Sequence, residues 1–334
     1  MKIASTSLAA QIKPRVRLNI TAAIERFGLV IALIILFALF GILLPDTFLS
    51  WGNISGMLGS QAVLAIVALA LIVPLTSNDF DMSIANVLVL ASVIVAVMNA
   101  QMGLSLWLAV PAALLMGLVV GLLNGFFITY FRIHSLIVTI ATGTFVSGLA
   151  TWLSGSQTIS GVDFALMDYV IVKRLFGVPL VFYYAILLAL VLWYVFEHTA
   201  MGRRMLFVGR GREVSRLSGI NADRVRWGAL IVSGLLGSIA GILYCGTQGA
   251  ADPSSGASFQ LPAFAAAFLG STAIQPGRFN AWGTIVAVYF LVIGITGLMF
   301  MGLSSFVQSL FYGGALLVAV VLSQWVRGRA EQQF

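Results

Sequence analysis

The sequence has little charge, and this shortage excludes most soluble folds. Only 9% of its 334 residues are charged, whereas 60% are hydrophobic. Soluble domains carry about 25% charged residues and about 45–50% apolar ones, so a soluble core has no room for this much apolar side chain. The composition therefore indicates an integral membrane protein.

Cysteine, histidine and lysine are also scarce, which excludes several kinds of site. Cys245 has no partner in the chain for a disulfide. The two histidines, His134 and His198, give poor support for a zinc site of the His/Cys type. None of the three lysines belongs to a G-x-x-x-x-G-K-[ST] phosphate loop. We therefore predict no catalytic residue, no cofactor and no metal in this chain, which on its own is not an enzyme.

Long apolar runs dominate what remains. A helix needs about 20 apolar residues to cross about 30 Å of hydrocarbon, whereas barrel strands would show shorter, alternating segments. The sequence predicts an all-α integral membrane protein with ten transmembrane or membrane-embedded helices. Residues 259–273 form the shortest segment and are rich in small residues, so we expect a re-entrant or interrupted helix there. The predicted segments are 28–44, 57–74, 83–99, 104–130, 135–154, 180–196, 228–244, 259–273, 282–301 and 305–325.

The net charge of +7 lies in the gaps between these segments. With the N-terminus inside, only Lys173 and Arg174 fall on the exterior side, as the positive-inside rule requires. The charge therefore predicts membrane topology, and we expect no nucleic-acid partner. The predicted organisation is a basic cytoplasmic segment 1–27, one transmembrane domain 28–326 and a cytoplasmic tail 327–334. The basic residues placed inside are Lys13, Arg15, Arg17, Arg26, Arg132, Arg278, Arg327, Arg329 and the arginines of 203–226.

Glycines four residues apart predict close helix packing. Gly117, Gly121 and Gly125 recur in one apolar segment, and Gly237 and Gly241 in another. Small residues at this spacing let two helix backbones approach each other in a membrane. The pattern favours a tight bundle and says little about function.

The stretch "LTSNDFDMSIAN", residues 75–86, places two carboxylates between two apolar segments. A carboxylate at membrane depth costs about 2.5–3.5 kcal/mol on insertion scales, so Asp79 and Asp81 should face water, protein or a helix end. Asp81 or Ser83 could cap the following helix. An interrupted helix of this kind often lines a transport site, but an ordinary cytosolic turn with an N-cap fits the spacing equally well.

Two loops are long enough to have a role of their own. Residues 198–226 form a cytoplasmic loop with seven arginines, in which a short helix from about Glu213 would place Val214 and Leu217 on one face and end at Gly219. Such a helix could insert into a cleft on another protein, or the loop could simply follow the positive-inside rule. The external loop 155–179 is a candidate docking surface or a solvated connector.

Three ordered blocks of the sequence resemble the transmembrane permease of ABC importers in the ribose-type monosaccharide family. The first is "FDMSIANVLVLASVIVA", which resembles I-D-L-S-V-G-S-V-L-A-L at Asp81, Ser83, Val87, Leu88 and Leu90. The second runs from Asn124 to Leu149 and matches at Asn124, Gly125, Ile137, Val138, Thr139, Ala141, Thr142, Gly148 and Leu149. The third, "GRGREVSRLSGINADRVR", resembles the coupling segment at Gly209, Glu213, Leu217, Ser218, Gly219, Ile220 and Asn221.

The resemblance implies a division of labour between several chains. Two permeases pair in the membrane, two cytoplasmic ATPases hold ATP and Mg²⁺ and grip the coupling helices, and a periplasmic sugar-binding protein delivers the solute. It places this chain in the bacterial inner membrane and implies import of a sugar or other small polyhydroxylated solute by alternating access. The implied coupling residues are Gly209, Glu213, Arg216, Leu217, Ser218, Gly219 and Ile220. The implied translocation path is bordered by Asp79, Asp81, Ser83 and Asn124.

The sequence also departs from the family pattern. Asn78 and Asp79 stand where the family usually has two glycines before its I-D-L-S element, and Arg210–Arg212 lacks the customary asparagine. The second acid could suit an unusual sugar or polyol, or mark one half of a heterodimer. Three alternatives stay open: an ion-coupled secondary transporter that uses Asp79 and Asp81, a branched-chain amino-acid ABC permease, and a membrane scaffold without transport.

Overall fold

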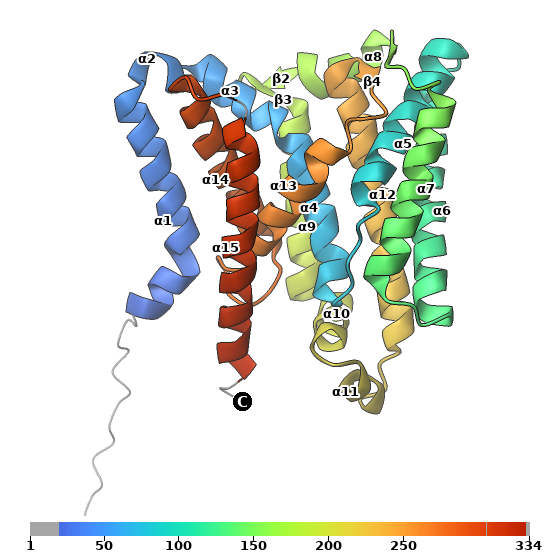
Figure 1. Ribbon diagram of the computed structural model, residues 1–334, viewed down its shortest axis with the longest axis vertical. Helices are drawn as coiled ribbons and strands as arrows, with labels where there is room; N and C mark the ends of the chain where they lie inside the picture. The colour runs from blue at the N-terminus through green and yellow to red at the C-terminus, as the bar shows by residue number, and fades with distance from the viewer. Residues whose placement is uncertain (1–19, 305, 332–334) are drawn as a thin grey trace, which may run out of the picture.

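The computed structural model describes residues 20–304 and 306–331, and over this part of the chain the fold is almost entirely helical (Figure 1). Nine helical stretches in the described residues are long and apolar enough to cross a membrane. They are α1 (Ile20–Leu43), α3 (Trp51–Ser60) with α4 (Ala62–Thr76), α5 (Ile84–Ala96) with η1 (Val97–Gln101), α6 (Leu106–Tyr130), α7 (Ser135–Leu153), α9 (Leu180–His198), α12 (Ala222–Gln248), α14 (Ala281–Phe300) and α15 (Phe306–Glu331).

The tenth predicted segment is the helix α13 (Ala257–Gly270), which has 14 residues. At about 1.5 Å per residue it spans about 21 Å, less than the hydrocarbon thickness. Its second half, from Pro262 to Gly270, is completely buried. The fold class predicted from the sequence, an all-α membrane protein with one short embedded helix, is therefore confirmed.

Several helix boundaries differ from the predicted ones. α1 begins at Ile20 and α15 continues to Glu331, so each runs into the terminal segment predicted as a cytoplasmic extension. α12 begins at Ala222, because the Asn221 side chain accepts a hydrogen bond from the Arg224 backbone N–H and caps the helix there. The remainder of both termini, residues 1–19 and 332–334, lies outside the described residues.

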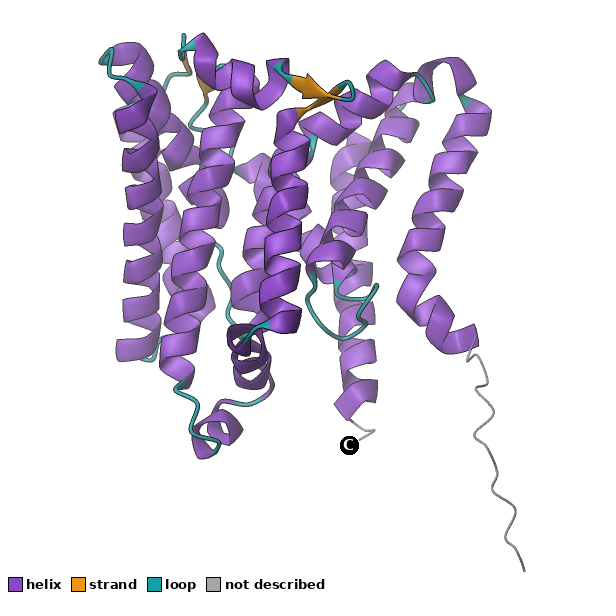
Figure 2. Ribbon diagram, turned by 180° about the vertical axis from the view of Figure 1, so that it is seen from behind, coloured by secondary structure: helices purple, strands orange, loops and turns teal. Residues whose placement is uncertain are grey.

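The shorter elements gather at the two ends of the bundle. At the upper end in Figure 1 lie α2 (Pro45–Phe48), α8 (Phe164–Met167), η2 (Asp168–Val172) and two small antiparallel strand pairs. One pair joins β1 (Ile159–Ser160) to β4 (Ala250–Ala251), and the other joins β2 (Arg174–Leu175) to β3 (Val178–Pro179). Figure 2 shows the strands only at this edge. At the opposite end lie α10 (Ala200–Arg210) and α11 (Arg212–Leu217), together with the start of α1 and the end of α15.

Aromatic side chains mark the two membrane boundaries on the outer helices. Trp107 at the start of α6 and Trp152 at the end of α7 are exposed at the upper end. Tyr130 and Phe131, at the opposite end of α6, are exposed as well. Tryptophan and tyrosine favour the headgroup level of both leaflets, so this placement fits a bundle that spans the bilayer along α6.

The centre of the bundle is α4, which is apolar all round. Each of its fifteen residues is buried. In the span that α3 and α4 form together, 83% of the most apolar stretch is buried, compared with 11% for α1. A helix that is hydrophobic on every side belongs in a core, whereas most of the apolar stretch of α1 is exposed on the surface of this chain. The helix α12 packs beside α4 and also against α5 and α6.

The glycine spacing has the predicted structural effect. Gly121 of α6 lies against the Leu230 carbonyl and the Ile231 backbone of α12, and Gly125 lies against the Trp227 ring. On another face of α12, Gly241 lies against Leu88 of α5. A side chain at any of these positions would meet backbone or a rigid ring, so glycine allows α12 to approach two helices at once.

Two helix breaks enter the interior from opposite ends. Below α4 the chain turns at Asn78, whose φ of 60° is tolerated by asparagine, and then rises in an extended form to the start of α5 (Figure 1). Above α12 the chain turns at Gly249 and descends through β4 to α13. The start of α13 reaches the start of α5, since an added Cβ on Gly256 would lie 3.3 Å from Asn86 Oδ1.

Candidate functional site

The first buried acid, Asp79, lies just after α4 and is paired with arginine. Arg226 of α12 donates from Nε to Oδ2 and from Nη2 to Oδ1, both at 2.7 Å. Asp79 is fully buried and the Arg226 side chain is only 5% exposed. A second guanidinium lies close by, with Nη2 of Arg212 in α11 at 3.7 Å from Oδ1. Two parallel hydrogen bonds between a guanidinium and a carboxylate are among the strongest and most directional polar contacts in proteins.

The second acid, Asp81, forms no ion pair with a basic side chain among the described residues and is held by two serines. Its Oδ1 accepts hydrogen bonds from the Ser83 backbone N–H at 3.0 Å and from Ser83 Oγ at 2.5 Å. Its Oδ2 accepts a hydrogen bond from Ser233 Oγ of α12 at 2.7 Å. The carboxylate also lies at the N-terminal end of α5, where the helix dipole favours negative charge. Of the two residues predicted as possible caps, Ser83 makes no side-chain cap hydrogen bond to α5, whereas Asp81 accepts the hydrogen bond of the Ser83 N–H just before the helix.

The backbone between the two acids is attached to α7. The Phe80 N–H donates to Ser135 Oγ at 3.1 Å, and the Met82 N–H donates to Thr139 Oγ1 at 3.0 Å. The Phe80 ring packs against Phe264 and Phe268 of α13. Non-helical backbone is tolerated in a membrane only where its polar groups find partners in the protein, and α7 supplies them here.

The four residues predicted to border the path lie together. Asn124 Nδ2 of α6 donates to Ser83 Oγ at 3.0 Å and so joins the Asp81 network. All four side chains are buried within this one chain, so their role in lining a path stays a prediction. Beside them, Asn86 and Gln260 are only half-buried. Asn124 Oδ1 and Ser238 Oγ are buried without a hydrogen-bond partner in the described part of the chain.

Sequence reasoning missed Arg226, which was assigned to the cytoplasmic loop. Because α12 begins six residues earlier than predicted, Arg226 lies inside this helix, two turns before Ser233 on the same face. The helix cap at Asn221 was the available signal, since asparagine before an apolar helix marks a helix start. With that boundary, the sequence would have placed a basic residue at the membrane edge.

The short helix predicted from about Glu213 is present as α11, and its coupling role stays a prediction. Val214 and Leu217 are 59% and 89% exposed, whereas Ser215 between them is buried. Gly219 follows the helix with a φ of +76°, which confirms the predicted helix end. This short helix therefore presents its apolar side chains away from the rest of the chain. Of the other predicted coupling residues, Glu213, Arg216 and Ser218 are exposed, and Ile220 is half-buried.

A second loop helix, α10, was not predicted. Its start is capped by Thr199, which accepts a hydrogen bond from the Gly202 N–H, and it buries Met205 and Val208. Near its end, Gly209 lies directly against the Thr76 carbonyl at the end of α4. Gly209 is therefore in contact with the transmembrane core, whereas Leu217 faces outward.

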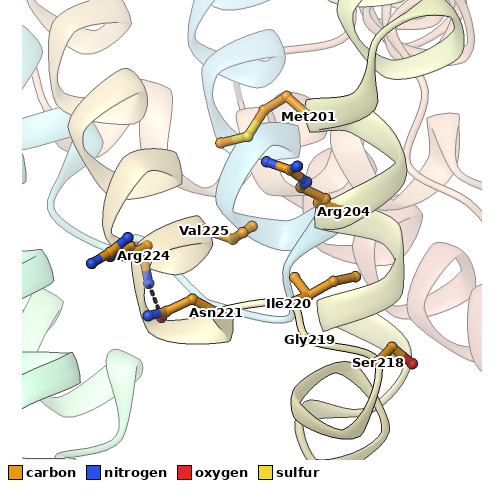
Figure 3. Close-up of a pocket in the computed structure, with 8 residues that line it drawn as sticks. All are labelled: Met201, Arg204, Ser218, Gly219, Ile220, Asn221, Arg224 and Val225. Atoms are coloured by element: carbon orange, nitrogen blue, oxygen red, sulfur yellow. Dashed lines mark hydrogen bonds between the residues drawn. The ribbon is translucent and has the colours of Figure 1, made fainter.

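A pocket of about 440 Å³ lies between the loop helices and α12 (Figure 3). The guanidinium groups of Arg204 and Arg224 border it on two sides, and both side chains are exposed. The residues that line it are Met201, Arg204, Ser218, Gly219, Ile220, Asn221, Arg224 and Val225. The pocket makes this end of the bundle attractive to acidic groups of a partner.

At the opposite end, the loop predicted to be external, residues 155–179, contains short helices and strands. Lys173 Nζ lies 2.9 Å from Asp168 Oδ2 and 3.6 Å from the centre of the Tyr169 ring. The hydrogen bond to Asp168 raises the pKa of Lys173. Phe176 at the tip of the β2–β3 hairpin is strongly exposed. Among the described residues there is no group of three or more histidine, cysteine or acidic side chains that could hold a metal ion.

The family model described as branched-chain amino acid transport system / permease component matches residues 53–321. The ribose import permease of Bacillus subtilis strain 168 is 31% identical over 311 residues, covering 92% of this chain and 95% of that protein. The L-arabinose ABC transporter permease of Azospirillum brasilense is 28% identical over 336 residues, covering 97% and 95%.

The D-allose transport system permease of Escherichia coli strain K12 is 23% identical over 304 residues, covering 90% of this chain and 92% of that protein. No solved structure matches the chain. Because the family model covers most of the sequence, the chain belongs to the family of branched-chain amino acid transport system permease components, and within it the chain is similar to permeases for monosaccharides.

Proposed function

We propose that the chain is one of two membrane-spanning subunits of an ABC importer that moves a monosaccharide, or a related polyhydroxylated solute, into the cytoplasm. The observation that carries this proposal is α11, which exposes Val214 and Leu217 beyond the transmembrane bundle. An exposed apolar pair on a short helix is what a partner with an apolar cleft binds. The basic residues around the pocket of Figure 3 add charge complementarity to acidic groups.

The implied assembly follows the resemblance. A cytoplasmic ATPase that carries ATP and Mg²⁺ would dock on α11, a second copy or paralogue of this chain would complete the membrane unit, and a periplasmic sugar-binding protein would dock on the external loop. In this proposal the chain resides in a bacterial inner membrane. In that assembly, the coupling residues are Gly209, Glu213, Arg216, Leu217, Ser218, Gly219 and Ile220.

The nature of the buried acids favours this function over ion coupling. Both oxygens of Asp79 are engaged by Arg226, and both oxygens of Asp81 accept hydrogen bonds from serines. An ion-coupled carrier needs a carboxylate that is free to bind a proton or Na⁺. The curated relatives are also sugar permeases, which favours a sugar over a branched-chain amino acid.

Reconstitution tests the proposal. We expect proteoliposomes that contain this chain, its ATPase and its binding protein to accumulate labelled ribose, allose or arabinose only when ATP is supplied. Ionophores should leave that uptake unchanged, because no ion gradient drives it. Uptake that needs an ion gradient and ignores ATP would contradict the proposal, and absence of flux under every condition would favour a scaffold.

A further inference from the structure

The cytoplasmic loop and the first helix break meet at one carboxylate. Asp79 is fully buried, two residues past the turn that ends α4, and it lies close to Arg226 of α12 and Arg212 of α11. We call these three residues the Asp79 clamp. Its members come from the broken helix, from the body of the bundle and from the loop that faces the cytoplasm. No other carboxylate among the described residues lies between two arginines in this way.

The two arginines hold the carboxylate unequally. Arg226 makes two hydrogen bonds of 2.7 Å and is almost fully buried, whereas Arg212 lies at 3.7 Å, beyond hydrogen-bond distance, and its side chain is 52% exposed. Coulomb attraction grows as the distance shrinks and as water is excluded. A movement of α11 that brings Arg212 inward would therefore strengthen its attraction and compete with Arg226.

The loop already touches the broken helix next to the clamp. Gly209, three residues before Arg212, lies against the Thr76 carbonyl at the end of α4. The chain then turns, with the Asp79 N–H donating to the Pro74 carbonyl at 3.0 Å. A displacement of the loop therefore reaches Asp79 in two ways: through the contact of Gly209 with the Thr76 backbone, and through the electrostatic attraction of Arg212.

Beyond Asp79 the break transmits movement to the start of α5. Phe80 and Met82 are attached to α7 through Ser135 and Thr139, and Asp81 is attached to Ser83 and to Ser233 of α12. A shift of the Asp79 carboxylate therefore acts on the extended segment 80–83, whose other contacts position the first turn of α5. Broken helices form the solute sites of many transporters, so a shift transmitted to this break reaches the part of the bundle where a path would be lined.

We propose that Asp79 is a positioning residue for transport. Arg226 holds its carboxylate in the arrangement described here, and Arg212 attracts the carboxylate more strongly when a partner moves α11 inward. The clamp then links the position of the loop to the shape of the membrane path. This inference rests on the proposed importer function and adds the residues that connect the cytoplasmic loop to the membrane path. An ion pair with only a structural role would need Arg226 but not Arg212. The effect of replacing Arg212 on transport therefore distinguishes the two roles.

The test compares Arg212→Gln with Arg210→Gln in the reconstituted complex of this chain, ATPase and binding protein. Both variants remove one exposed arginine of the same loop, but only Arg212 faces Asp79. ATP hydrolysis and sugar uptake are measured in the same vesicles. We expect Arg212→Gln to lower the sugar transported per ATP by about tenfold, the scale of a typical coupling free energy, and Arg212→Lys to restore most of it. Arg210→Gln should behave as wild type.

A double variant tests the buried half of the clamp. Asp79→Asn alone would leave the Arg226 charge unpaired and could prevent folding, so we pair it with Arg226→Gln, which removes both charges and keeps similar shapes. The double variant should also hydrolyse ATP with little transport. The inference is overturned if Arg212→Gln keeps wild-type transport per ATP, whatever the double variant does, or if Arg212→Gln abolishes ATPase binding outright. If the importer function itself is wrong, the wild-type complex will show no ATP-dependent uptake.

Discussion

Replacement of Leu217 by aspartate will remove the stimulation of ATP hydrolysis by this chain and leave the transmembrane bundle folded. Leu217 is 89% exposed at the end of α11, so its own chain loses no packing when it is replaced. Burial of a leucine against a partner is worth about 1.5–3 kcal/mol, and a charge in an apolar cleft adds a desolvation cost. A total of about 3 kcal/mol corresponds to roughly hundredfold weaker ATPase binding.

Titration of the detergent-purified chain with its ATPase measures this effect. Leu217→Met is the matched control, since methionine keeps an apolar side chain of similar volume and should bind within a few-fold of wild type. The thermal unfolding midpoint of both variants should equal that of wild type. Equal ATPase affinity for the aspartate and methionine variants would show that α11 does not dock where we propose.

The second large effect concerns the packing of α12. A glycine-to-alanine substitution adds one methyl group, and it should destabilise the bundle where α12 is closely packed but not where it is loosely packed. An added Cβ on Gly241 would lie 2.8 Å from Ala91 Cβ and against the Leu88 carbonyl of α5, which is backbone and cannot turn aside. An added Cβ on Gly228 would meet only the flexible end of Met201 at 3.6 Å. Gly241→Ala should therefore destabilise the bundle by about 1–3 kcal/mol through overpacking.

Gly228→Ala is the control in the same helix. Alanine favours a helix over glycine by about 1 kcal/mol, so this variant should match wild type or exceed it. The measurement is the midpoint of thermal unfolding in detergent, together with the fraction of chain that stays monodisperse. A shift of the two variants in the same direction by the same amount would contradict the close approach of α12 to α5.

The sequence predicted the helices well because each long apolar run is its own signal. A run such as 104–130 has no other stable form in a membrane than a helix, and the structure has α6 there. The stretch Trp51–Gly56 was left out because its glycines and polar residues lower its hydropathy, although it forms the first part of a span that continues into α4. Boundaries were therefore the weaker part of the prediction.

The site was predicted only in part because its bonds join distant residues. The break at 77–83 and its position before a helix could be read locally, since Asp81 and Ser83 are neighbours in the chain. The partnership of Asp79 with Arg226 could not, because no local pattern indicates which of seven arginines in a loop will reach a given carboxylate. The helix α10 was missed for a related reason, since its buried residues face protein that lies far away in the sequence.

The separation of Asp79 and Arg226 by 147 residues has a consequence for how the chain is made. During synthesis the carboxylate emerges long before the guanidinium that neutralises it, and an unpaired charge is strongly disfavoured in hydrocarbon. The stretch around Asp79 must therefore wait near water or inside the insertion machinery until α12 arrives. The first half of the bundle therefore completes its assembly only after the second half has been synthesised.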